Sequence, residues 1–128
     1  MSFEFYKESY AGAIKTISIG KGDKAITVGG ETCYPLYQFE GEMPHKPKVA
    51  MEIWDMVPEE WPAAAMEPFK DVVSDPAAWA KKCVDEYGAE IIVLQLKSID
   101  PNGNDASPAD ASATVKKVLG AIEVPLVV

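Results

Sequence analysis

The sequence DPAAWAKKCVDEYGAEIIVLQLKSIDP, residues 75–101, contains in order a helix start, a helix stop, an apolar strand and a polar turn. Asp75 can accept hydrogen bonds from the first free N–H groups of a helix, and Pro76 suits the first helical position because it has no N–H to leave unpaired. Gly88 predicts the helix end. Apolar residues recur between them at helical spacing and predict one buried face. They are Trp79, Ala80, Cys83, Val84 and Tyr87.

A nearly continuous apolar run follows this helix at residues 91–96 and is interrupted only by Gln95. The run is too short for an ordinary helix and too continuous for a strand with one face in water, so it predicts a strand covered on both faces, as in a parallel sheet. An earlier strand is expected at residues 48–54, where Met51 and Ile53 point away from Glu52.

A second helix signal lies after the polar turn. Ser107 is the expected N-cap, Pro108 takes the first helical position, and Asp110 lies in the first turn, where the helix dipole favours a negative charge. VPLVV, residues 124–128, then predicts a third strand. The order strand, helix, strand, helix, strand predicts two right-handed βαβ units with neighbouring parallel strands.

The end of this pattern suggests a larger fold. No helix is expected after the third strand, so one sheet edge would stay uncovered. We therefore expect an α/β fold that is the N-terminal, truncated part of a TIM (β/α)8 barrel, which needs about 250 residues. Residues 1–47 would form a leader and an antiparallel β-hairpin that plugs the barrel bottom, and residues 48–128 the first three parallel strands. The alternative is a small open α/β sheet, complete as it stands.

The net charge and the distribution of basic residues limit the kinds of molecule that this chain is expected to bind. The chain has 128 residues and a formal charge of −8. Its twelve basic residues are scattered, which disfavours nucleic acid and anionic membranes because phosphate binding needs clustered Lys and Arg. No apolar run approaches the roughly 18 residues that span a bilayer. We expect a cytoplasmic protein. Cys83 on the apolar helix face favours a buried thiol, and the lone His45 disfavours a metal site.

The candidate site follows from the barrel prediction, because the loops at the carboxyl ends of the strands form the functional face of a barrel. Gln95 and Lys97 would share one strand face and lie beside Glu52 of the neighbouring strand. Two interpretations stay open. One is a buried Glu52–Lys97 ion pair that sets the strand register, and the other is a ligand-contacting role for Gln95, Lys97 or Asp100. No nucleophile, general base and orienting partner can be assembled from these residues alone.

Three segments carry a resemblance to a known family. GGETCYPLYQFEGEMPHKPKVAMEIWD, DPAAWAKKCVDEYGAEIIVLQLKSIDPNG and VKKVLGAIEVPLVV together resemble the small (delta) subunit of the corrinoid iron–sulfur protein of the acetyl-CoA decarbonylase/synthase system of anaerobic acetogens and methanogens. The similarity extends from about Ile14 onward. Its specific parts are FEGEMP with the following M-E-x-x-D, the W-A-x-K-C-V-x-E-Y-G-A helix and the D-P turn, whereas the βαβ pattern is generic.

The resemblance implies a TIM barrel that forms a heterodimer with a large subunit carrying a [4Fe–4S] cluster and a corrinoid. The corrinoid would lie between the subunits. Its cobalt would accept a methyl group from a methylated pterin through a separate methyltransferase and pass it to acetyl-CoA synthase, in the carbon-fixing Wood–Ljungdahl pathway. The resemblance implies that this chain is a non-catalytic scaffold and cap with no redox centre of its own. The sequence agrees with the last point, because two cysteines cannot supply the four thiolates of a cluster.

The residues expected to contact the cofactor are Asp55, Gln95, Lys97 and Asp100. Two other hypotheses remain. In the first, the chain belongs to a pterin-binding methyltransferase barrel that is itself an enzyme, and Asp55, Gln95 and Asp100 hold the pterin by hydrogen bonds. In the second, it is a truncated gene product with no independent function.

Overall fold

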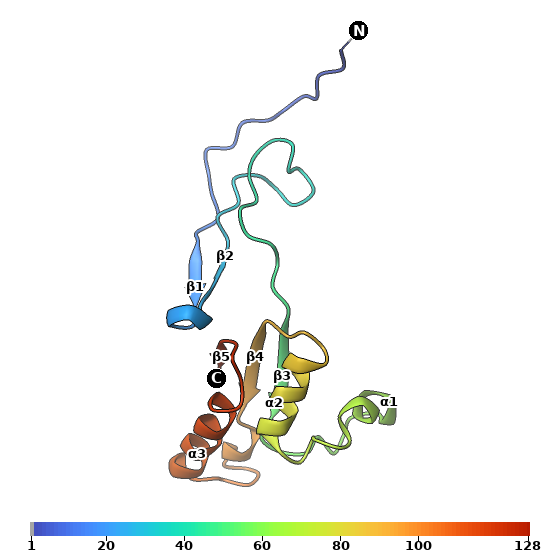
Figure 1. The fold of residues 1–128 in the computed structure, drawn as a ribbon, viewed down its shortest axis with the longest axis vertical. Helices are drawn as coiled ribbons and strands as arrows, with labels where there is room; N and C mark the ends of the chain where they lie inside the picture. The colour runs from blue at the N-terminus through green and yellow to red at the C-terminus, as the bar shows by residue number, and fades with distance from the viewer. Residues whose placement is uncertain (1) are drawn as a thin grey trace.

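A three-stranded parallel sheet with two connecting helices forms the body of the molecule (Figure 1). The computed structural model describes residues 2–128, so Met1 of the predicted leader lies outside the described part. The elements of the body are β3 (Ala50–Trp54), α2 (Pro76–Asp85), β4 (Ile91–Gln95), α3 (Pro108–Leu119) and β5 (Leu126–Val127). The strand order β3-β4-β5 confirms the predicted α/β fragment of a barrel, and these three strands do not close the barrel.

An antiparallel hairpin precedes the sheet, as the sequence predicts. It consists of β1 (Ile17–Ile19), the 3-10 turn η1 (Gly22–Lys24) and β2 (Ile26–Val28). The Lys24 ammonium lies 2.7 Å from the Glu123 carboxylate and donates a hydrogen bond to the carbonyl oxygen of Ile122. Because both partners precede β5, the hairpin turn lies at the amino ends of the parallel strands, which is the bottom of the expected barrel.

Both main helices begin with the predicted caps. The Asp75 carboxylate accepts hydrogen bonds from the N–H groups of Ala77 and Ala78 at 3.0 and 3.4 Å. Ser107 and Asp110 form a reciprocal capping box, in which each side chain accepts from the backbone N–H of the other. At the end of α2, Gly88 adopts a φ of 68°, a conformation that other residues rarely take.

Trp79 on α2 packs against the long connection between β3 and α2, residues 55–75, which we call the excursion. This excursion contains the short elements α1 (Ala63–Met66) and η2 (Glu67–Phe69). The Trp79 ring makes a T-shaped contact with Trp61 at a centroid distance of 5.8 Å, and Trp61 in turn contacts Trp54 on β3 at 5.4 Å. Phe69 packs on Trp79 at 5.8 Å. The prediction that these aromatic residues hold the excursion against the body is therefore confirmed.

The helices cover only one face of the sheet (Figure 1). Ile53, Ile92 and Leu94 point toward the helices and are at most 1% exposed. Glu52 and Gln95 lie on the opposite face and are exposed. The prediction of a strand covered on both faces is therefore confirmed only at the amino end of β4, where Ile91 on this second face is 6% exposed, and is wrong at its carboxyl end. The apolar run fits a strand whose second face lines a barrel interior.

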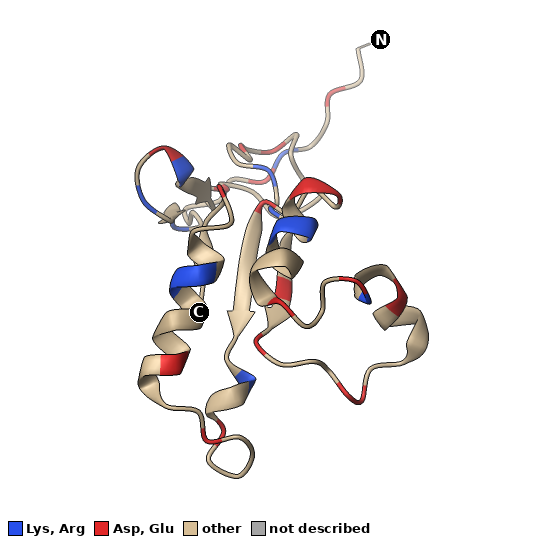
Figure 2. Cartoon of the chain, turned by 60° about the horizontal axis from the view of Figure 1, so that its bottom comes forward, with Lys and Arg blue, Asp and Glu red and all other residues tan. Residues whose placement is uncertain are grey.

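The surface of the molecule carries mixed charges and exposed apolar side chains. Lysines and acidic residues are interspersed over the chain without a basic cluster (Figure 2), which matches the scatter expected from the sequence. Tyr87 and Leu119 lie near the ends of α2 and α3 and are about half exposed, although Tyr87 belongs to the apolar face predicted for the first helix. Within residues 2–128, no helix has the length and apolar character needed to cross a membrane.

The cap at Asp75 generates a prediction about acid stability. Lys117 donates to the Asp75 carboxylate at 2.9 Å, and this bond with the two cap hydrogen bonds lowers the pKa of Asp75. Asp75→Ala should destabilise the protein by about 1 kcal/mol at pH 7. Because the folded pKa is depressed, this difference should be complete above the unfolded pKa of about 4 and shrink as the pH falls through the folded pKa. Urea unfolding at neutral and acidic pH measures it.

A matched control for this test is Glu59→Ala, which changes an exposed carboxylate outside the helices. It should alter the free energy of unfolding by less than about 0.5 kcal/mol. An Asp75→Ala deficit of the same size at every pH would contradict the assignment of the pH dependence to this cap.

Trp79 generates a prediction about core packing. Its side chain is 1% exposed, and no hydrogen-bond acceptor within the described residues pairs with its indole N–H. Trp79→Ala should cost about 3–5 kcal/mol because it leaves a cavity. Trp79→Phe keeps an aromatic ring and removes a buried unpaired donor, so its cost should be less than half of that. Denaturant unfolding of both variants checks this, and equal costs of the two variants would contradict the prediction.

Candidate functional site

A hollow of about 230 Å³ lies at the carboxyl ends of β3 and β4. Its walls come from the loop after β3 and from the turn and loop after β4. The lining residues are Trp54, Met56, Val57, Lys97, Asp100, Gly103 and Asn104. Two of the four sequence-predicted site residues, Lys97 and Asp100, therefore line one hollow at the expected end of the strands.

Asp55 holds the two loops together at the edge of this hollow. Its backbone N–H donates to the carbonyl oxygen of Gln95 at 3.3 Å. Its carboxylate accepts from the backbone N–H of Ser98 at 3.0 Å and from the Ser98 hydroxyl at 2.5 Å. The Ser98 carbonyl in turn accepts from the N–H of Ala106, just before α3. Asp55 thus connects the loop after β3 to the start of the loop after β4, and Ser98 connects that start to the end of the same loop, just before α3.

Sequence reasoning missed Ser98. A serine in the turn KSID carries no signal by itself, because its partner lies 43 residues earlier in the chain. The only available signal was the position of Asp55 directly after one strand and of Ser98 directly after the next.

Lys97 contacts an aromatic ring. Its ammonium lies 4.8 Å from the centroid of the Trp54 ring, within the range of a cation–π interaction. The Trp54 indole N–H donates to the Glu52 carboxylate at 2.8 Å. Glu52, Trp54 and Lys97 therefore form a chain of contacts in which the indole separates the two charges.

The expected Glu52–Lys97 ion pair is therefore wrong: no such pair exists among the described residues. The reason is that β4 ends at Gln95, and Lys97 begins the 3-10 turn η3 (Lys97–Ile99). The two-residue alternation of a strand no longer applies there, and the Lys97 ammonium lies over the Trp54 ring instead of pairing with Glu52.

Gln95 and Asp100 have different surroundings. Gln95 is the register partner of Trp54 and lies exposed on the open face of the sheet, outside the lining of the hollow. The Asp100 carboxylate accepts from the N–H of Asn102 at 2.8 Å, and the Asp100 carbonyl accepts from Gly103 at 3.0 Å. Asp100 thus shapes the loop whose later residues complete the hollow, and its other carboxylate oxygen remains available to a ligand.

The chemistry of this hollow is that of a binding surface. An indole ring and two apolar side chains can support a flat group, while an ammonium, a carboxylate and the Asn104 amide can bind its polar edges.

Across residues 2–128, no three His, Cys, Asp or Glu side chains gather to hold a metal ion. The Cys83 thiol is fully buried, as predicted, and burial raises its pKa to about 11, which keeps it protonated at neutral pH.

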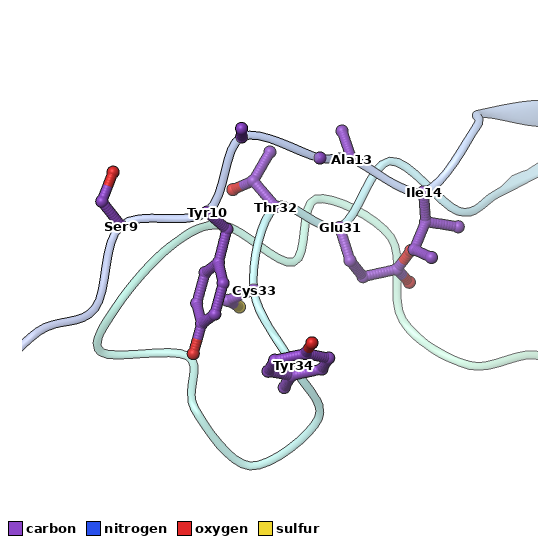
Figure 3. Close-up of a pocket in the computed structure, with 10 residues that line it drawn as sticks. Ser9, Tyr10, Ala13, Ile14, Glu31, Thr32, Cys33 and Tyr34 are labelled. Carbon is purple, nitrogen blue, oxygen red and sulfur yellow. The ribbon is translucent and has the colours of Figure 1, made fainter.

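A second, larger hollow of about 490 Å³ lies between the leading segment and the loop after β2 (Figure 3). Residues 9–14 and 31–34 line it. The Tyr10 hydroxyl donates to the Glu40 carboxylate beside it, which raises the pKa of Tyr10 above its usual value. The sequence did not predict this hollow, because it arises from two irregular segments whose contact has no periodic signal.

Comparisons with known proteins agree on one family. The family model for the CO dehydrogenase/acetyl-CoA synthase delta subunit matches residues 16–128. The acetyl-CoA decarbonylase/synthase complex subunit delta of Archaeoglobus fulgidus is 36% identical, and the match covers 98% of this chain and 29% of the relative. The subunits of the same description from Methanothermobacter thermautotrophicus and Methanocaldococcus jannaschii are also 36% identical, over 94% of this chain and 31% of each relative.

These matches include both the sheet and the carboxyl-end hollow. The chain spans 29–31% of the length of these curated relatives. The resemblance read from the sequence is confirmed, and the chain belongs to the family of CO dehydrogenase/acetyl-CoA synthase delta subunits.

Proposed function

We propose that this chain is the N-terminal part of a scaffold subunit that caps a corrinoid held mainly by a larger partner. The observation that carries the proposal is the match of residues 16–128 to the delta subunit family. The partner would be the large corrinoid and iron–sulfur subunit, in a cytoplasmic heterodimer. The methyl group would come from a methylated pterin through a separate methyltransferase and pass to acetyl-CoA synthase, in the Wood–Ljungdahl pathway.

The carboxyl-end hollow suits one edge of a corrinoid, which is a broad, nearly flat macrocycle with amide side chains. Trp54, Met56 and Val57 offer an apolar surface to the ring, and Lys97 can donate to an amide oxygen. Asp100 can accept from an amide N–H. When bound, the corrinoid supplies the cobalt that carries the methyl group; the residues of this chain would orient the ring and exclude water from its edge.

The cation–π contact preorganises this surface. Trp54 is held from one side by its hydrogen bond to Glu52 and from the other by the Lys97 ammonium. Asp55, although expected to contact the cofactor, has both carboxylate oxygens occupied by Ser98. We propose that Asp55 positions the loops and that Lys97 and Asp100 touch the ligand. Gln95 would face the interior of the completed barrel.

The proposal is tested with the full-length delta subunit and the corrinoid-loaded large subunit. Addition of the delta subunit should change the absorbance spectrum of the corrinoid, because this subunit would exclude water from part of the ring. In the Lys97→Gln variant, the delta subunit concentration needed for half of this change should rise about fivefold. This factor corresponds to the loss of a cation contact of ~1 kcal/mol. Lys24→Gln, at the opposite end of the strands, is the matched control and should leave the titration unchanged.

The competing hypothesis of a pterin-binding enzyme has its own outcome in this system. Calorimetry of the isolated full-length delta subunit with a methylated pterin should show no binding. Binding of the pterin, together with an unchanged corrinoid spectrum, would replace the proposed scaffold role by the methyltransferase alternative.

The role of Asp55 in positioning the loops is tested by hydrogen exchange. Asp55→Ala removes both acceptors from Ser98, so exchange of the Ser98 amide should accelerate about tenfold or more. Asp55→Asn keeps an oxygen acceptor for that amide and should accelerate its exchange much less. Amide exchange followed by NMR distinguishes the two variants, and an unchanged Ser98 rate in Asp55→Ala would contradict the role.

A further inference from the structure

The leading segment and the loop after β2 display a cluster of exposed apolar side chains at one end of the molecule. We call this cluster the aromatic patch. Its members are Phe3, Phe5, Tyr34, Leu36, Tyr37 and Phe39. Phe5 contacts Phe39 at a centroid distance of 5.6 Å, and Phe39 contacts Tyr37 at 5.8 Å, so that residues more than 30 positions apart form one surface. Contiguous exposed apolar surface of this kind marks an interaction site.

Hydrogen bonds hold the two halves of the patch together. The N–H of Glu8 and the hydroxyl of Tyr10 both donate to the Glu40 carboxylate. The N–H of Ile14 donates to the carbonyl oxygen of Glu31 at 2.8 Å. Tyr10 also packs edge-on against Tyr34 at 5.0 Å, beside the 490 Å³ hollow (Figure 3). The patch therefore combines a held apolar surface with a recess that can receive a partner side chain, as interface hot spots do.

Leu36 is an independent sign that this surface is used. It is 83% exposed and has a φ of 70°, a left-handed conformation that costs a leucine roughly 1–2 kcal/mol. The N–H of Tyr37 donates to the Tyr34 carbonyl at 3.0 Å and closes a β-turn with Pro35 and Leu36 at its centre. Glycine or asparagine is favoured at the position of Leu36 in such a turn. The turn thus holds a strained leucine in solvent.

The charge around the patch selects the class of partner. Residues 2–12 and 31–43 contain five carboxylates and one lysine. The residues concerned are Glu4, Glu8, Glu31, Glu40, Glu42 and Lys7. A second copy of this chain would bring like charges together, and nucleic acid or an anionic membrane would be repelled in the same way. The complementary occupant is a protein with an apolar surface rimmed by Lys and Arg.

The patch lies at the opposite end of the sheet from the candidate corrinoid site. The hairpin turn contacts the segment before β5, at the amino ends of the strands. The leading segment and the loop of the patch extend beyond that hairpin, away from the sheet (Figure 1). A partner bound there would leave the carboxyl-end hollow free.

We propose that the aromatic patch is a second docking surface, which binds a basic-rimmed apolar face of another subunit of the same complex. This inference rests on the proposed function, because it takes the partner to be a subunit of the acetyl-CoA decarbonylase/synthase complex. The patch anchors the subunit in the assembly from the amino ends of its strands, and the carboxyl ends remain available to the corrinoid.

The test uses the full-length delta subunit, alone and mixed with the other purified subunits of the complex. Hydroxyl-radical footprinting should show Phe5, Leu36 and Phe39 reactive in the isolated subunit and protected in the mixture. Leu36→Asn should weaken binding in sedimentation experiments about tenfold, while the protein stays folded because asparagine suits the turn. Leu119→Asn, which removes an equally large exposed side chain from α3, should bind like the wild type. Binding should also weaken with added salt.

Four outcomes would overturn the inference. Protection of the patch in the isolated subunit would mean that its own chain covers it, and protection that rises with its concentration would indicate a second copy. Wild-type binding by Leu36→Asn would show that the patch does not dock, and would leave the corrinoid proposal intact. Loss of all binding between the wild-type subunits would overturn both proposals. Conversely, patch protection without any corrinoid spectral change would remove the proposed function of the carboxyl-end hollow alone.

Discussion

The packing of Trp79 against the excursion after β3 is the contact on which the rest of the body depends. Trp79 is nearly fully buried on α2 and contacts Trp61 and Phe69, and Trp61 continues the contact to Trp54 on β3. A long proline-rich connection between a strand and its helix costs conformational entropy. The aromatic contacts offset that cost and hold α2 over the sheet, which seals Ile53, Ile92 and Leu94 from water.

The polarity of the parallel strands then separates two ends of the molecule, each of which carries a proposed site. At the carboxyl ends, Asp55 and Ser98 connect the loops, and Trp54 and Lys97 meet over the hollow. Beyond the amino ends, the leading segment and the loop after β2 carry the aromatic patch. Trp54 belongs to both the core contact and the proposed ligand surface, so the stability of the excursion and the shape of the hollow are coupled through one indole.

Sequence reasoning succeeded for features that depend on local or periodic signals. The cap at Asp75, the capping box at Ser107 and the stop at Gly88 involve partners within three or four residues. It failed for the Glu52–Lys97 ion pair, because β4 ends at Gln95 and Lys97 begins a 3-10 turn, where its ammonium lies over the Trp54 ring. It placed Asp55 and Asp100 near the right end of the strands and missed Ser98, whose role depends on a contact between two loops.

The order of capped helices and apolar strands is enough to specify a parallel α/β unit, since short-range hydrogen bonding and side-chain periodicity decide each element and the handedness of βαβ connections decides their arrangement. The sequence motifs also identify the family. Which side chains meet at the carboxyl ends, and which apolar residues gather at the amino ends, was decided only by the tertiary structure. Many of those contacts join residues far apart in the chain, up to 43 positions, through irregular loops, and no periodic signal in the chain specifies the path of such loops.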